Sequence, residues 1–193
     1  MSRTPPVALT IAGSDSGGGA GLQADLRTFT TCGVHGCVAV TAVTVQNSVR
    51  VSGVVDIPPD TVADQIRAVV TDIGVGATKT GMLASSPIIK AVAGVCDEVG
   101  IGTGGTGVGT PFVVDPVAAS MHGDQLLADD ALDALRCELF PRATLITPNL
   151  DEVRLLVDID VRSREQQYEA ARALFTLGPQ WVLVKGGHLH DDP

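Results

Sequence analysis

Residues 7–29 have the sequence VALTIAGSDSGGGAGLQADLRTF, and this stretch decides the fold of the chain around it. The apolar run Val7–Ile11 predicts a short buried strand, and the glycines that follow predict an open loop. A helix is expected to begin at Gly21, so the loop exposes backbone N–H groups at a helix N-terminus, where a ligand can bind them. We therefore predict a strand, a loop and a helix, with a small-molecule site in the loop.

The composition indicates one acidic domain. The 193 residues are 45% hydrophobic but only 3% aromatic, so we expect residues 1–193 to form one core of Val, Ala, Leu and Ile. The formal net charge of −9 would repel a polyanion, and no cluster of Lys and Arg is interleaved with aromatic residues. We expect a small-molecule ligand and no nucleic-acid partner.

The cysteines and the N-terminus predict a cytoplasmic protein with no membrane partner. None of the four cysteines forms a C-x-x-C pair, and residues 1–6 lack the charged start and long apolar core of a signal peptide. Reduced thiols are expected in the cytoplasm. Cys32, His35 and Cys37 suggest a metal cluster as an alternative, but a fourth ligand at a recognisable spacing is not evident.

Strand-like and helix-like segments alternate along the chain, which predicts parallel strands joined by helical crossovers. We expect an α/β fold with about six core strands in a central, mostly parallel sheet, and a small hairpin or lid at residues 49–57. The glycine-rich segment 100–110 leads into a strand and is expected to be a flexible surface loop. The predicted strands cover residues 7–11, 37–45, 77–82, 112–116, 145–147 and 181–185, and the predicted helices cover 21–29, 58–70, 86–99, 128–139, 149–157 and 163–177.

Polar residues fall at or just after the carboxyl ends of the predicted strands. Open α/β sheets bind their ligands at this edge, so the pattern favours a ligand site there. The alternative is that polar residues appear at strand ends in any case, because the chain reaches the surface. The residues concerned are Gly13, Gln46, Lys79, Asp115, Asn149, Glu152 and Lys185.

The glycine loop does not match the two common phosphate-binding motifs well. It contains no G-x-x-x-x-G-K-[ST], so a Walker-type site is not supported. Residues 19–24 fit G-x-G-x-x-A, but a dinucleotide site also requires an acidic residue at the end of the second strand. That strand ends at Gln46 and Asn47, which makes a nicotinamide cofactor a weak alternative.

Six segments together resemble the hydroxymethylpyrimidine and phosphomethylpyrimidine kinases of thiamine biosynthesis, within the ribokinase-like superfamily. The resemblance implies a three-layer ribokinase-like domain that uses ATP and Mg²⁺. It also implies phosphorylation of 4-amino-5-hydroxymethyl-2-methylpyrimidine and then of its monophosphate, by a homodimer. The segments are residues 12–25, 41–47, 79–82, 114–117, 147–152 and 184–188.

The resemblance assigns pyrimidine contacts to Gly13, Asp25 and Gln46, with Met82 as an apolar wall. The chemistry of Gln46 agrees, because its amide offers a donor and an acceptor to an aminopyrimidine edge. The alternative is a strand-end amide that satisfies the local backbone.

The resemblance also implies a phosphate and metal side. Asp115 and Glu152 are the implied metal ligands, with Asn149 beside them near the phosphates, and Mg²⁺ prefers such oxygen donors. Lys185 is an implied phosphate contact, and Lys79 is a weaker candidate. A turn carboxylate at Asp115 and a favourable acidic residue in the first helical turn at Glu152 are the alternatives.

The sequence departs from the family pattern after His188. A late glycine-rich turn of the type G-T-G-[CD], which supplies the anion hole and the activating residue in this superfamily, does not follow it. We expect the catalytic residues to lie beyond Pro193, so that the domain is C-terminally truncated and the 193-residue chain is inactive. A non-catalytic pyrimidine-binding fragment and a pyridoxine-type vitamin kinase are the alternatives.

Overall fold

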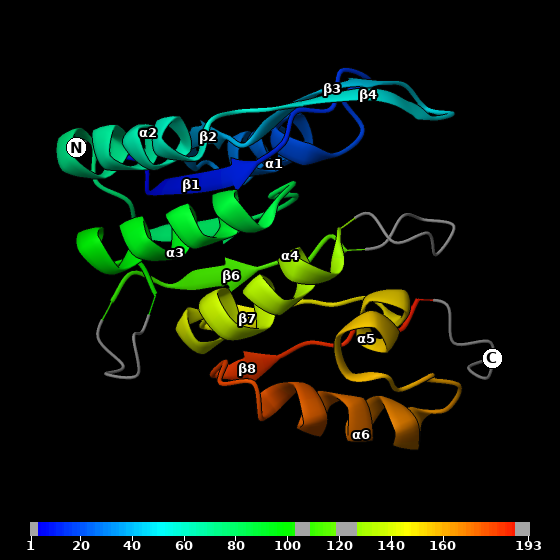
Figure 1. The fold of residues 1–193 in the computed structure, drawn as a ribbon. Helices are drawn as coiled ribbons and strands as arrows, with labels where there is room; N and C mark the ends of the chain where they lie inside the picture. The colour runs from blue at the N-terminus through cyan, green and yellow to red at the C-terminus, as the bar shows by residue number, and fades with distance from the viewer. Residues whose placement is uncertain (1–3, 103–108, 119–126, 188–193) are drawn as a thin grey trace.

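The computed structural model describes residues 4–102, 109–118 and 127–187, and its centre is a six-stranded parallel sheet (Figure 1). This agrees with the prediction of about six core strands in a parallel sheet. The strands shorten across the sheet, from six residues in the first two to two residues in the last two. Their order is β2 (His35–Val40), β1 (Val7–Ala12), β5 (Ala77–Thr80), β6 (Phe112–Val114), β7 (Leu145–Ile146) and β8 (Trp181–Val182).

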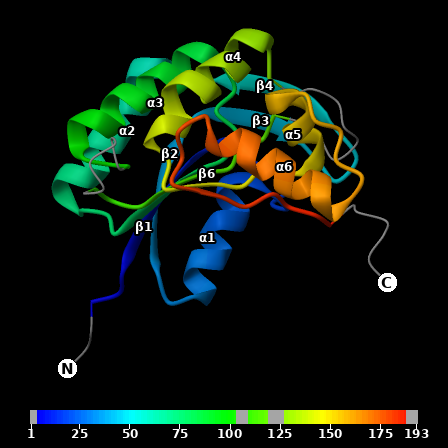
Figure 2. The ribbon, with the colours of Figure 1, turned by 90° about the horizontal axis from the view of Figure 1, so that it is seen from below.

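Helices cover both faces of the sheet, so the fold has three layers. Figure 2 shows α1 (Gly21–Thr31) on one face and α2 (Pro59–Asp72), α3 (Ser86–Val99) and α4 (Asp129–Ala134) on the other. The strand order reverses at β1, and right-handed crossovers that run in opposite directions place their helices on opposite faces. The switch point for a ligand therefore lies between β1 and β5.

The chain after α4 forms the last two strands of the sheet, β7 and β8. A π-helical turn, Leu135–Leu139, and a 3₁₀ turn, Phe140–Arg142, continue from α4 toward β7. The two helices α5 (Leu150–Val157) and α6 (Arg164–Phe175) connect β7 to β8. The longest apolar runs meet in the interior, where Leu9, Ile89, Phe112 and Phe140 are fully buried.

The predicted strand over residues 37–45 is wrong, because the chain changes sheets within it. Strand β2 ends at Val40, and β3 (Ala42–Gln46) pairs antiparallel with β4 (Val51–Asp56) in a separate two-stranded hairpin (Figure 1). Thr41 fixes the change of direction. Its N–H donates to Ala12 O at 3.0 Å, its hydroxyl donates to Met82 O at 2.7 Å, and its carbonyl accepts from Ile57 N.

The hairpin differs from the buried strand that the apolar run predicted. Val43 and Val45 of β3 are exposed, and the hairpin expected at residues 49–57 takes its first strand from the earlier run. Most of the glycine-rich segment 100–110 lies outside the described residues, although Ile101 and Thr110 at its ends form a parallel bridge. No helix among the residues described is long and apolar enough to span a membrane.

Candidate functional site

Asp15 organises the glycine loop. Its buried carboxylate accepts hydrogen bonds from the N–H groups of Gly17, Gly19 and Ala20, each at 2.8 Å. Burial raises the pKa of Asp15, but these donors outweigh the burial and hold the pKa below its usual value. The anion at the N-terminus of α1 is thus a side chain of the protein itself, a role that the glycine pattern did not reveal.

Gly13 and Met82 meet at the switch point between β1 and β5. The Gly13 N–H donates to Met82 O at 3.1 Å, and a Cβ atom at position 13 would lie 2.6 Å from Met82 Cε. Gly21 closes the loop from above with a φ of +55°, and a Cβ there would lie 2.4 Å from the Gly13 carbonyl oxygen. The structure therefore brings two of the predicted pyrimidine contacts together.

Asp25 of α1 forms an ion pair with Lys79 of β5, near the same switch point. Both of its carboxylate oxygens lie 3.0 Å from Lys79 Nζ, and Oδ2 also accepts from Thr10 Oγ1 at 2.6 Å. Lys79, the weaker candidate for a phosphate contact, neutralises Asp25 in this structure. The role of Asp25 toward a pyrimidine stays a prediction.

Gln46 ends β3 beside the glycine loop. Its backbone N–H donates to Ser16 Oγ at 2.8 Å, and the same hydroxyl donates to Gln46 O at 2.7 Å. The Gln46 side chain is half-buried, and its amide has no hydrogen-bond partner within the described part of the chain. The amide is therefore available to a ligand, and the alternative of an amide that satisfies local backbone is not observed.

A second cluster lies at the carboxyl ends of β6, β7 and β8. Lys185 Nζ donates to Asp115 Oδ1 at 3.1 Å, and Thr147 Oγ1 lies 3.4 Å from the same oxygen. The Asp115 side chain is 24% exposed and that of Lys185 is 43% exposed, so solvent reaches both. Two of the residues assigned to the phosphate and metal side are thus in direct contact.

Asn149 and Glu152 form a capping box at the start of α5. Asn149 Oδ1 accepts from Glu152 N and Glu152 Oε2 accepts from Asn149 N, each at 2.8 Å. Glu152 Oε1 also accepts from Ala118 N at 3.2 Å, so both carboxylate oxygens are engaged. Burial raises the pKa of Glu152, although the Asn149 N–H and the charge of Lys185 oppose the rise. The spacing N-x-x-E could have revealed this box in the sequence.

The metal side contains few open ligands. In residues 4–102, 109–118 and 127–187, no three His, Cys, Asp or Glu side chains come together as a metal-binding group. Asp115 keeps Oδ2 without a partner among these residues, whereas Glu152 is 2% exposed. An ion at this edge would therefore contact Asp115 rather than Glu152.

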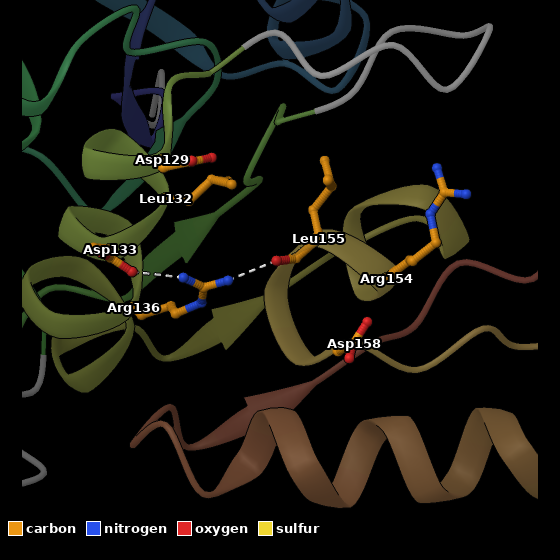
Figure 3. A pocket seen from close by; sticks show the side chains of 7 residues that line it. All are labelled: Asp129, Leu132, Asp133, Arg136, Arg154, Leu155 and Asp158. Carbon is orange, nitrogen blue, oxygen red and sulfur yellow. Dashed lines mark hydrogen bonds and ion pairs between the residues drawn. The ribbon is translucent and has the colours of Figure 1, made fainter.

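A cavity of about 430 Å³ lies elsewhere, between the helices α4 and α5 (Figure 3). Arg136 crosses it, donating to Asp133 Oδ1 at 2.7 Å and to Leu155 O at 2.6 Å. The guanidinium thus satisfies a carbonyl at the end of α5. None of the predicted site residues lines this cavity, so its size does not identify the site.

Comparisons with known proteins identify the family of the chain. Residues 15–193 match the family of phosphomethylpyrimidine kinases. A hydroxymethylpyrimidine/phosphomethylpyrimidine kinase from Mycobacterium tuberculosis is 64% identical over 186 residues, which cover 96% of this chain and 65% of that relative. The corresponding protein of Streptomyces coelicolor is 50% identical and covers 98% of this chain and 67% of its own length. The chain thus spans about two-thirds of the length of these curated relatives.

Solved structures give the same result for the fold. The crystal structure of phosphomethylpyrimidine kinase from Clostridium difficile 630 superposes with a TM-score of 0.87 at 38% identity and covers 97% of this chain and 78% of its own. A pyridoxal kinase from Staphylococcus aureus, in complex with AMP-PCP and pyridoxal, gives a TM-score of 0.81 at 35% identity and covers 98% and 65%. The expected three-layer ribokinase-like fold is therefore confirmed, and the chain belongs to the phosphomethylpyrimidine kinase family.

Proposed function

We propose that this chain carries the pyrimidine-binding and metal-binding side of an ATP-dependent kinase. Its substrates are 4-amino-5-hydroxymethyl-2-methylpyrimidine and the monophosphate of that pyrimidine. The observation that carries the proposal is the Gln46 amide, which has no hydrogen-bond partner among the described residues and whose backbone is bonded to Ser16, three residues after Gly13 in the glycine loop. Family membership supports the reaction class.

The proposed pyrimidine subsite uses three kinds of contact. The Gln46 amide donates to a ring nitrogen and accepts from the adjacent amino group, as its donor and acceptor pair allows. Met82 offers an apolar side to the ring, and the absence of a side chain at Gly13 leaves room for the Met82 side chain. Asp25 offers a carboxylate that Lys79 and Thr10 hold in place.

The proposed phosphate side consists of Asp115 and Lys185. Mg²⁺ would be held by the free oxygen of Asp115 and by water, which matches the preference of this ion for few carboxylates. When bound, Mg²⁺ neutralises charge on the phosphates of ATP. The Lys185 ammonium binds a phosphate oxygen as a point charge, and Asn149 and Glu152 fix the backbone of the segments that present Asp115.

We also propose that the 193-residue chain binds the pyrimidine without robust turnover. Phosphoryl transfer depends on positioning and on neutralising the charge of the transferred group. A G-T-G-[CD] turn that opens a late helix does not occur in this sequence. The homodimer and the cytoplasmic location that the resemblance and the composition suggest are part of the same proposal.

Calorimetric titration of the chain with 4-amino-5-hydroxymethyl-2-methylpyrimidine tests the proposal. Gln46→Ala removes both hydrogen bonds, so we expect the affinity to fall about 30-fold, while the melting temperature stays nearly unchanged. Gln180→Ala is the matched control, because Gln180 is exposed and directly precedes β8, at the opposite edge of the sheet. Unchanged affinity in Gln46→Ala contradicts the proposed subsite.

A pyridoxine-type kinase is the second candidate. The similarity to the pyridoxal kinase of Staphylococcus aureus is the observation that favours it. Titration of the same chain with pyridoxal separates the two substrates. Tighter binding of pyridoxal than of the aminopyrimidine would replace the first candidate by the second.

A further inference from the structure

The glycine loop and the β3–β4 hairpin are joined by side-chain hydroxyls. The Ser14 N–H donates to Ala42 O at 2.9 Å, and Thr44 Oγ1 donates to Ser14 O at 2.7 Å. Two residues further along, Ser16 Oγ bonds both backbone polar groups of Gln46. A loop and a hairpin that are 30 residues apart in sequence therefore lie side by side here, next to the predicted pyrimidine contacts (Figure 1).

Gln46 needs these bonds because it lies at an irregularity of the hairpin. The pairing of β3 with β4 shifts register between Val45 and Gln46, so Gln46 is placed opposite Val51 out of step with the preceding pairs. Such a shift redirects a side chain, but it also weakens the ladder that would hold the residue. The Ser16 hydroxyl supplies a donor and an acceptor to Gln46, and it also lies 3.3 Å from Thr44 O.

The loop side of this contact is rigid. Asp15 next to it binds three backbone N–H groups, and a Cβ atom at Gly17 would lie 3.2 Å from Asp15 Oδ1 and 3.4 Å from Asn47 Cα. Ser16 is thus held between a carboxylate-bound turn and the hairpin. A hydroxyl in a fixed position can fix the backbone torsions of its partner.

We infer that Ser16 is a positioning residue for pyrimidine recognition: its hydroxyl holds the backbone of Gln46 so that the side-chain amide faces the ligand. The inference rests on the proposed function, because it assigns Ser16 an effect only through the Gln46 amide. Ser16 itself makes no contact with the substrate. Its loss lets Gln46 sample other torsions, and the affinity for a ligand that reads the amide falls.

Binding of two ligands to the 193-residue chain tests the inference. One is 4-amino-5-hydroxymethyl-2-methylpyrimidine, and the other is the same molecule without its amino group. We expect Ser16→Ala to weaken binding of the first about tenfold and of the second less than about twofold, because only the first uses the full amide. Ser16→Thr keeps the hydroxyl and is expected to restore the affinity.

Two further variants make the test specific. Ser52→Ala is the matched control, because the Ser52 hydroxyl donates to Val45 O at 3.0 Å on the same hairpin but makes no bond to Gln46. In the Gln46→Ala background, Ser16→Ala is expected to cause no further loss, since the side chain through which it acts is gone.

The outcomes separate the inference from the proposed function. Equal losses for both ligands, or an additive loss in the double variant, mean that Ser16 has only a structural role, and the Gln46 assignment stands. Unchanged affinity in Ser16→Ala with a large loss in Gln46→Ala also overturns the inference alone. Unchanged affinity in Gln46→Ala overturns the pyrimidine subsite, and the role of Ser16 with it.

Discussion

Two buried carboxylates, one in each half of the sheet edge, have pKa values shifted in opposite directions. Asp15 is 6% exposed and Glu152 is 2% exposed, yet the pKa of Asp15 is lowered and that of Glu152 is raised. Asp15 accepts from three N–H groups of its own loop at 2.8 Å, whereas Glu152 accepts from two, one of them at 3.2 Å. At Asp15 the backbone donors outweigh burial, whereas at Glu152 the deeper burial and the nearby charge of Asp115 outweigh the donors and raise the pKa.

The two halves of the candidate site also differ in how their polar groups find hydrogen-bond partners. In the glycine-loop half, backbone groups are satisfied by Asp15 and by hydroxyls, and the Gln46 amide has no partner in the part of the chain that the structure describes. In the other half, the charged groups Asp115 and Lys185 bind each other. Each half also holds an ion pair, Asp25 with Lys79 in the first and Asp115 with Lys185 in the second. Because only the first half also offers the Gln46 amide, we expect it to suit a neutral, hydrogen-bonding ligand and the second half to exchange its ion pair for a charged ligand.

Breaking the loop around Asp15 should have the largest effect. Gly21→Ala places a Cβ atom 2.4 Å from a backbone oxygen at a φ of +55°, so we expect the free energy of unfolding to fall by roughly 3–4 kcal/mol. Urea denaturation measures it. Gly94→Ala is the control, because Gly94 lies inside α3 with open space around it, and that change should stabilise the chain by about 0.5–1 kcal/mol. Similar changes in the free energy of unfolding for Gly21→Ala and Gly94→Ala would contradict the close contact between residue 21 and the Gly13 carbonyl oxygen.

Removing the charge of Asp15 comes next. Asp15→Asn leaves buried N–H groups without full acceptors, and we expect a loss of about 2 kcal/mol at pH 7. Because the folded pKa is lowered, the contribution of Asp15 is present above the unfolded value, near 3.9, and is lost as the pH falls below it. The gap between wild type and Asp15→Asn should therefore narrow below about pH 4. Asp72→Asn, at the exposed end of α2, should show a gap near zero throughout.

Glu152→Gln should have the smallest effect and the opposite pH dependence. We expect a loss of about 1 kcal/mol at pH 7, since one of the two acceptor oxygens becomes an NH₂ group. The folded pKa is raised, so the wild type gains stability as the pH falls from 7 toward the unfolded value near 4.3, and the variant does not. In denaturation curves, the gap between wild type and Glu152→Gln should widen as the pH falls toward the unfolded pKa of about 4.3. Glu169→Gln, on the exposed face of α6, is the control. If the stability gap between wild type and variant narrows with falling pH in both Glu169→Gln and Glu152→Gln, the proposed difference between Asp15 and Glu152 is contradicted.

The sequence predicted the elements well where one pattern was sufficient. Helix 86–99 has the predicted bounds. The apolar run 37–45 misled because hydrophobicity does not show which sheet a strand joins. The bonds of Thr41 to distant backbone decide that.

The placement of the candidate site residues at strand ends was predictable from the sequence, but their contacts with one another were not. Gly13, Met82, Asp115 and Lys185 lie at strand ends, and their pairing follows from the strand order. The partners of Asp25 and Gln46 could not be predicted, because Lys79 and Ser16 are 54 and 30 residues away. The pairing of β5 with β1 and the turn at Thr41 bring them together.

The strands shorten across the sheet, and this predicts the order in which their backbone hydrogen bonds break by local unfolding. Strands β1 and β2 share six pairs of residues, whereas β7 and β8 share two. Short ladders are broken by small, local fluctuations, and long ones require global unfolding. Amide protons of β1 should thus exchange with solvent last and those of β7 and β8 first, so the Asp115 and Lys185 side of the site loosens while the glycine-loop side persists.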